Sequence, residues 1–119
     1  MPPREWTFRI LDMIDRIERI GGYVEGLTEP QFRENTLVID AVIRNLEVIG
    51  EAASRLPVEV LEAYPDIPWH EMRGMRNLLI HEYFGLSLPI VWRTVTHDLP
   101  PLLAVLRPMV SESGTNAGP

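Results

Sequence analysis

The segment WTFRILDMIDRIERIGGYVEGL, residues 6–27, decides the fold class, because its apolar residues recur at every third or fourth position. That spacing gathers them on one face of a helix and leaves the charged residues on the other. It predicts a helix from about Arg4 to about Glu25. Gly21 and Gly22 lie within this stretch, but the apolar repeat continues past them. We therefore expect the helix to tolerate both and to be capped by Gly26.

The same periodicity continues along the chain. A start signal at residues 28–31 has a capping hydroxyl, a proline in the first turn and a glutamine, and it opens the second helix. Gly50 inside the body of that helix indicates close helix packing, and Pro100 and Pro101 should bend or break the last helix. The body of the second helix is predicted over residues 36–55. Further helices are predicted over residues 57–63, 68–84 and 88–106. With no strand alternation, the fold class is all-α: an antiparallel bundle of four main helices plus a short one.

Length and composition indicate one folded domain. The 119 residues, 45% hydrophobic and 24% charged, can bury a core without disulfides. We assign residues 1–110 to that domain and expect residues 111–119 to form a disordered tail, since they lack an apolar repeat. Cysteine is absent, which excludes thiolate chemistry. No apolar stretch long enough for a membrane span and no signal-peptide pattern occurs, so we expect a cytoplasmic protein.

The charge balance limits how this chain could bind nucleic acid. A net charge of -6 argues against a broad basic surface of the kind that holds many phosphates. All 11 basic side chains are arginines, which bind phosphate through a planar bidentate fork. Any contact with RNA must therefore be local.

Residues 72–84, MRGMRNLLIHEYF, hold the densest group of side chains suited to catalysis. Arg73, Asn77 and His81 are spaced along one helix face, whereas Arg76 and Tyr83 share a neighbouring face. Arg76 and His81 are about 140° apart on an ideal helix. To act on one substrate atom they need a curled arginine, an unwound helix end or a second subunit.

These residue types suit cleavage of RNA without a metal ion. A histidine can move protons at cellular pH, and an arginine can hold the phosphate while negative charge builds on its oxygens. The reaction normally uses separate acid and base groups, but this helix has a single histidine, His81. A two-fold dimer would supply two, and we hypothesise such a dimer. On residue types alone, Arg76 and His81 could equally be surface or helix-cap residues.

The motif resembles that of the HepT family within the HEPN superfamily. In that family an arginine is followed by a polar residue, then by a histidine and a tyrosine two residues further on. Here Arg76, Asn77, His81 and Tyr83 fill these places. The resemblance extends to residues 45–52, 67–69 and 98–100.

This resemblance implies a helical-bundle homodimer that acts as a toxin: a metal-independent endoribonuclease with no cofactor. Arg76 and His81 would be catalytic in a cleft between subunits, and we expect Asn77, Tyr83 and Arg73 to contact the RNA. It also implies an antitoxin, an MntA-like nucleotidyltransferase that transfers AMP from ATP onto Tyr83. The alternatives are a non-catalytic module that presents nucleotide or substrate to such a nucleotidyltransferase, and a purely structural bundle.

Two further groups of polar residues have competing interpretations. His70-Glu71 could suggest a zinc-protease helix, but Gly74 stands where the second histidine is required, so no metal site is predicted. The polar stripe of the second helix could be a solvated face or could line the cleft and orient Arg76. We favour solvation for Asp40 and leave both interpretations open for Arg44 and Glu51; the stripe consists of Asp40, Arg44, Glu47 and Glu51.

Overall fold

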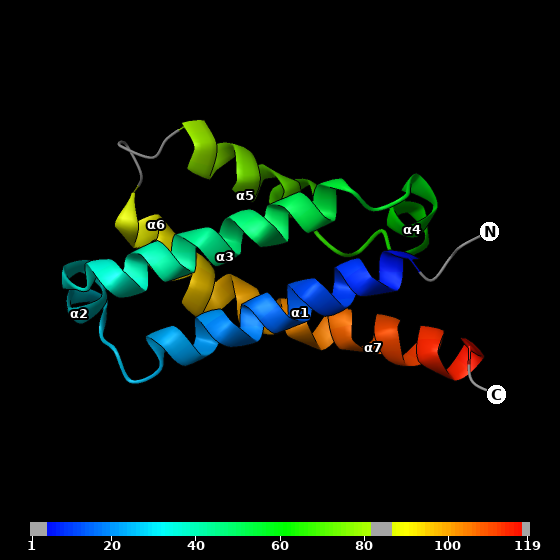
Figure 1. Ribbon diagram of the computed structural model, residues 1–119, viewed down its shortest axis with the longest axis horizontal. Coiled ribbons are helices and arrows are strands. Elements are labelled where there is room, and N and C mark those ends of the chain that lie inside the picture. The colour runs from blue at the N-terminus through cyan, green and yellow to red at the C-terminus, as the bar shows by residue number, and fades with distance from the viewer. Residues whose placement is uncertain (1–4, 82–86, 118–119) are drawn as a thin grey trace.

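The structure, a computed structural model, describes the backbone of residues 5–81 and 87–117, and side chains within 6–76 and 87–111. All the regular secondary structure in these ranges is helical (Figure 1). The elements are α1 (Glu5–Val24), α2 (Glu29–Glu34), α3 (Thr36–Ser54), α4 (Val58–Ala63), α5 (Trp69–His81), α6 (Leu88–Arg93), the π-helical turn η1 (Thr94–Asp98) and α7 (Leu99–Ala117). The all-α prediction is confirmed.

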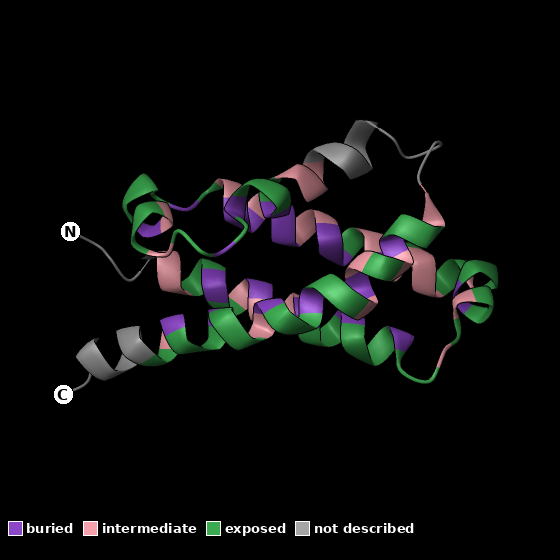
Figure 2. Ribbon diagram, turned by 180° about the vertical axis from the view of Figure 1, so that it is seen from behind, coloured by how far each residue is buried: buried purple, intermediate pink, exposed green. Residues whose placement is uncertain are grey.

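The long helices form an antiparallel bundle. The most extensive contacts join α1 to α3, α3 to α5, and α1 to α7, so the order in space is α5, α3, α1, α7. Successive helices in that order run in opposite directions (Figure 1). Their buried faces point toward one another across the bundle (Figure 2). The most deeply buried large side chains are Phe32, Ile10, Met13, Ile20, Ile49, Met72, Leu99, Leu106, Met109 and Val42.

Helix α1 follows the expectation from its apolar repeat. It passes through Gly21 and Gly22 and ends at Val24. Gly26 then has φ +79°, a left-handed conformation that side chains with a Cβ rarely adopt. Its predicted role after the helix end is therefore confirmed.

The predicted second helix is divided in two at Asn35. The Thr28 capping box opens α2 as expected: the Thr28 hydroxyl accepts from the Gln31 amide at 3.3 Å, and the Thr28 amide donates to Gln31 Oε1 at 2.9 Å. Seven residues after Thr28, however, the Asn35 side chain accepts from the Val38 amide at 3.1 Å. This second cap starts α3 as a new helix, because asparagine satisfies a free amide at a helix start.

The last predicted helix is also remodelled, as the two prolines require. It consists of α6, η1 and α7. The Leu99 amide reaches back to the Thr94 carbonyl, a wider turn than that of an α-helix, immediately before Pro100. Proline cannot donate a backbone hydrogen bond and crowds the preceding turn, so the widening lies where the bend was expected.

Helix α7 runs further than the sequence predicts. An end near Leu106 and a disordered tail from residue 111 were expected, but the helical backbone continues to Ala117. Met109 is buried in the core, so apolar packing carries the helix beyond its predicted end. Once a helix is established, each further residue adds a hydrogen bond without the cost of a new nucleus, so the backbone can continue past Met109.

The closest approach that positions the motif helix is between α3 and α5 at Gly50. A Cβ built on Gly50 would lie 2.6 Å from the Arg76 amide nitrogen and 2.9 Å from the Arg76 Cβ. The amide nitrogen is part of the α5 backbone and the Cβ is bonded directly to it, so neither atom can move away by a side-chain rotation. The predicted close packing at Gly50 is confirmed, and it sets the position of Arg76 along α3.

Replacing Gly50 with Ala should destabilise the fold by about 1–3 kcal/mol, because α3 and α5 would have to separate. Gly74 on α5 is the matched control, since a Cβ there would meet nothing within 4 Å. Gly74→Ala should instead stabilise by about 1 kcal/mol through helix propensity. Urea unfolding of the two variants measures both effects, and equal shifts in the same direction would rule out the tight contact.

Candidate functional site

The start of α5 is anchored before the motif begins. The Trp69 indole N–H donates to the Tyr64 carbonyl at 3.0 Å, and both Trp69 and Met72 are buried. Ile67, just before the helix, is buried as well. These apolar contacts, together with the close contact between Gly50 and Arg76, fix the position of α5. They therefore also fix the position of the Arg76 backbone, from which its side chain extends.

Arg76 is held by two polar groups from α3. Its Nη1 donates to Glu51 Oε1 at 2.8 Å and to the Ser54 hydroxyl at 3.4 Å. The Arg76 side chain is 36% exposed and that of Glu51 is 40% exposed, so the pair lies at the surface of the bundle. In the described part of the chain these bonds use only Nη1, which leaves Nε and Nη2 able to bind a ligand.

Glu51 serves two arginines at once. Its second oxygen, Oε2, accepts from Arg55 at 3.0 Å. The hydrogen bond from Arg76 and, next, that from Arg55 hold the pKa of Glu51 below its ordinary value of 4.5. Because the folded pKa is lowered, this contribution to stability is present above that ordinary value and is lost as the pH falls through the folded pKa. At neutral pH the carboxylate is therefore charged and holds Arg76.

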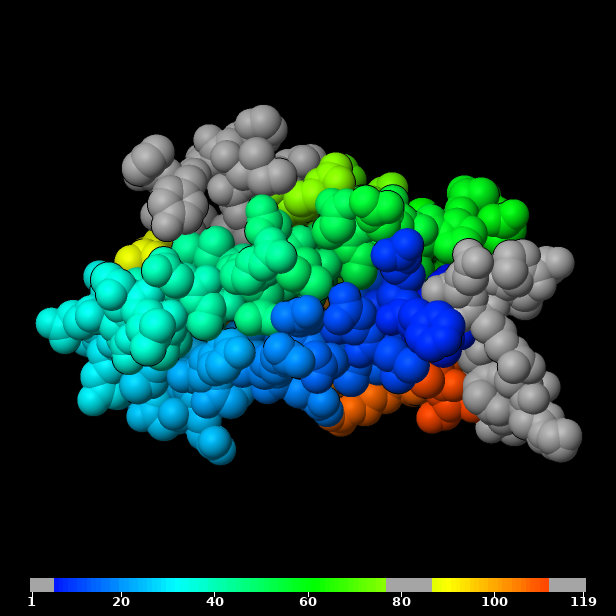
Figure 3. All heavy atoms as spheres, in the orientation of Figure 1, coloured from blue at the N-terminus to red at the C-terminus, as the bar shows by residue number. Residues whose placement is uncertain are grey.

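A surface cleft of about 300 Å³ opens beside this pair, where α1, α3 and α5 meet. Figure 3 shows the face of the molecule along which α1 and α3 lie side by side. Three arginines from three different helices line the cleft, together with three carboxylates. The charged lining residues are Arg9, Asp12, Arg44, Glu47, Glu51 and Arg76.

The predicted site residues have different outcomes. Arg76 lies at the cleft, whereas Arg73 is exposed and does not line it. Asn77 and His81 belong to α5, but their side chains lie outside the described residues, as does all of Tyr83. Their roles therefore remain predictions.

The open interpretations of the polar stripe on α3 are now resolved residue by residue. Asp40 is exposed, as favoured. Glu51 orients Arg76, and Arg44 lines the cleft while also pairing with Glu47 at 2.9 Å. Neither Ser54 nor Arg9 was predicted as a site residue from the sequence. A signal for Ser54 was present, since it lies about one helical turn after Gly50, where α5 is closest.

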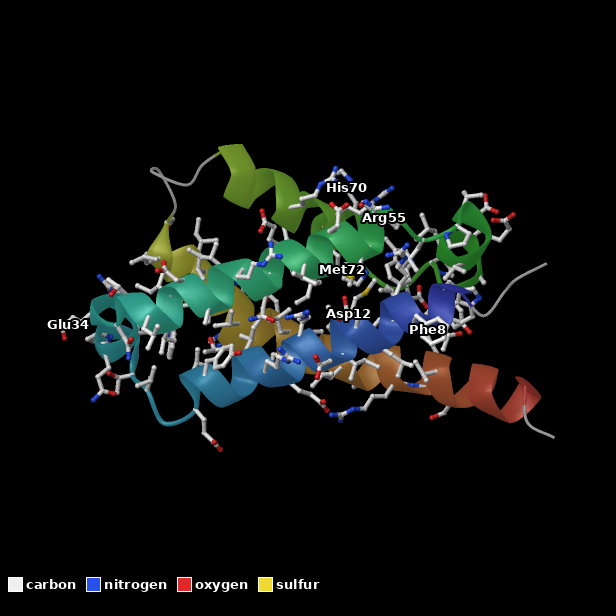
Figure 4. All side chains as sticks on the ribbon, in the orientation of Figure 1. Phe8, Asp12, Glu34, Arg55, His70 and Met72 are labelled. Carbon is white, nitrogen blue, oxygen red and sulfur yellow. The ribbon has the colours of Figure 1, made fainter. Side chains whose placement is uncertain are left out.

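Neither His70 nor His97 lines this cleft. His70 is exposed at the start of α5, where Figure 4 shows it beside Arg55, and His97 is exposed in η1. Among the described residues, no three histidine, aspartate or glutamate side chains are grouped so that they could hold a metal ion. None of the described helices is long and apolar enough to cross a membrane.

Comparison with known proteins now gives the class of this chain. The family model described as "Ribonuclease HepT-like" matches residues 13–109, which include α3, α5 and the Arg76 motif but not the start of α1, where Arg9 and Asp12 line the cleft. The chain belongs to this HepT-like family, and the resemblance drawn from its motif is confirmed.

Individual relatives cover most of the chain. A protein of Thermococcus cleftensis named "Probable ribonuclease HepT" is 40% identical over 91 residues, 76% of this chain and 83% of the relative. A candidate RNase of Methanocaldococcus jannaschii is 37% identical over 100 residues, 84% of this chain and 83% of the relative. Another, from Caldanaerobacter subterraneus, is 40% identical over 101 residues, 84% of this chain and 87% of the relative. No solved structure matches the chain.

The protonation of Glu51 can be followed directly through the NMR chemical shift of its carboxyl carbon in a pH titration. In the wild type the midpoint should lie below 4.5. Arg76→Gln should raise it toward 4.5, and Arg55→Gln should raise it by less, because the Arg76 hydrogen bond is the larger cause. A midpoint unmoved by Arg76→Gln would disprove the pairing.

Proposed function

We propose that this protein is a toxin that cuts RNA without a metal ion, with Arg76 and His81 as its catalytic residues. The observation that carries the proposal is Arg76, which Glu51 and Ser54 hold at a cleft in a chain of the HepT-like ribonuclease family. Relatives in the same family are named as ribonucleases, which also supports RNase activity. An arginine held in this way presents its remaining N–H groups with little loss of entropy on binding.

The proposed reaction is an attack within the RNA strand. A base removes the proton of a ribose 2′ hydroxyl, the 2′ oxygen bonds to the adjacent phosphorus, and the bond from phosphorus to the 5′ oxygen breaks. An acid returns a proton to that oxygen, so the products are a 2′,3′-cyclic phosphate and a 5′ hydroxyl. His81 supplies proton transfer, and Arg76 stabilises the charge that builds on the phosphate oxygens. Glu51 acts as a positioning residue.

The active unit we propose is a homodimer. Arg76 and His81 diverge by about 140° around an ideal helix, and the motif offers one histidine where the reaction needs two proton-transfer groups. Among the described contacts, α3 is the one helix against which α5 packs extensively, and this is compatible with a second copy packing against α5 from another side. A two-fold arrangement with α5 beside the axis would bring two copies of His81 into one groove.

Neutralisation would act on the same motif. We propose that a partner nucleotidyltransferase adenylylates Tyr83: the phenolic oxygen bonds to the α-phosphorus of ATP, pyrophosphate leaves, and the phenolic proton passes to solvent. The attached phosphate would place a negative charge near Arg76 and fill space that RNA needs. Tyr83 lies two positions after His81, so one modification would affect the whole motif.

Purified protein is expected to cut RNA in the presence of EDTA and to leave a 2′,3′-cyclic phosphate. Arg76→Ala and His81→Ala should each slow cleavage by about 100-fold or more, through lost charge stabilisation and lost proton transfer. His97→Ala, an exposed histidine in η1, is the control and should retain full activity. RNA that is bound but never cut would favour the non-catalytic module instead.

The same assay, repeated with the adenylylating partner and ATP, tests neutralisation. Wild type and the control Tyr23→Phe should lose activity and gain one adenylate, whereas Tyr83→Phe should stay unlabelled and cut RNA at the same rate with and without the partner. Labelling of Tyr83→Phe at another residue would refute the assignment.

A further inference from the structure

The charges around the cleft differ from those of the chain as a whole. The chain carries a net charge of -6, but arginines reach the cleft from three helices: Arg9 from α1, Arg44 from α3 and Arg76 from α5. Such convergence is notable because an acidic protein can bind phosphates only through a local basic site. Arg76 alone is accounted for by the proposed reaction.

Each carboxylate in the cleft is already engaged by an arginine. Asp12 lies 3.4 Å from Arg16 Nε, and Glu47 lies 2.9 Å from Arg44. Glu51 is shared between Arg76 and Arg55. The cleft and its immediate partners thus contain five guanidinium groups and three carboxylates, so the local balance is positive.

Arg9 and Arg44 are also the two arginines most easily recruited by a ligand. Arg9 is exposed and pairs with none of the carboxylates whose side chains the structure describes. The Arg44 side chain is 71% exposed, and its ion pair with Glu47 lies within one helix. Exposed pairs of this kind contribute little to stability, so exchanging the glutamate for a phosphate would cost little.

We propose that Arg9 and Arg44 form a second phosphate-binding position, through which a single-stranded RNA runs from Arg76 across α3 toward α1. This inference rests on the proposed nuclease function and adds the path of its substrate. A volume of about 300 Å³ is at the lower end for small-ligand pockets, enough for part of a single strand and too small for a duplex. Arginine forks on either side of α3 would grip successive parts of the backbone without reading the bases.

The proposed RNA path can be tested independently of catalysis by measuring binding to an RNA that cannot be cut. The probe is a short, mixed-sequence RNA with a fluorescein label and every 2′ hydroxyl methylated, followed by fluorescence anisotropy over a range of salt concentrations. Arg9→Gln and Arg44→Gln should each weaken binding by about tenfold, the effect of losing one charged hydrogen bond. Each should also reduce the salt dependence by about 0.7 in slope, the value for one phosphate contact with a single strand.

Arg33→Gln is the matched control. Arg33 lies on α2 in an exposed ion pair with Glu29 at 3.1 Å and is not part of the cleft. Arg33→Gln removes one positive charge, as do Arg9→Gln and Arg44→Gln. Its affinity and salt slope should stay close to those of the wild type. Equal effects of Arg33→Gln and the two cleft variants would overturn the path.

Three results distinguish this inference from the proposed function. If the wild type cuts ordinary RNA but Arg9→Gln and Arg44→Gln bind the methylated probe normally, the path is wrong and the nuclease stands. If the wild type neither binds nor cuts RNA, both are wrong. If AMP displaces the probe at micromolar concentration, the cleft holds a free nucleotide, and the RNA path is overturned.

Discussion

The contact between Gly50 and the backbone of Arg76 is the constraint on which the site depends. It brings α3 and α5 so close that a single methyl group would collide with the Arg76 backbone. At that separation the side chains of Glu51 and Ser54, which follow Gly50 on α3, reach Arg76 directly. The arginine is therefore placed by the packing of two helices before any ligand arrives.

Electrostatics then determines how that arginine is presented. Glu51 is kept ionised by two guanidinium groups, and it binds Arg76 through Nη1 alone. None of the described residues binds the two remaining nitrogens of the guanidinium group, which lie beside the cleft. A partly exposed ion pair adds little to stability. Its value lies in fixing a flexible side chain where a phosphate would bind, and this preorganisation favours catalysis.

Much of the fold could be predicted from the sequence because the apolar periodicity is strong. Gly26, the Thr28 cap and the close approach at Gly50 each followed from local chemistry. The division at Asn35 was missed because the apolar repeat continues through it, and only the side-chain cap reveals the new start. The length of α7 was underestimated because the predicted helix was ended at Leu106, although Met109, three residues further on, continues the apolar repeat and is buried in the core.

The candidate site was only partly predictable, for a related reason. Arg76 stands out through its motif, but Glu51 lies 25 residues earlier in the chain, and spacing within one helix cannot show which side faces α5. Gly50 held the missing information, since a glycine that marks the closest contact places its neighbour at the same interface. Arg9 could not be found in this way, because only the packing of α1 on α3 brings it to the cleft.

The central claim is that Glu51 holds Arg76 for binding the scissile phosphate, and single-turnover cleavage by Glu51→Gln tests it most directly. The account predicts a rate lower by up to about 100-fold, as for a misplaced catalytic group, in a protein that remains folded. Arg55→Gln, which leaves the bond between Glu51 and Arg76 in place, should slow the reaction far less. Full activity of Glu51→Gln would contradict the account.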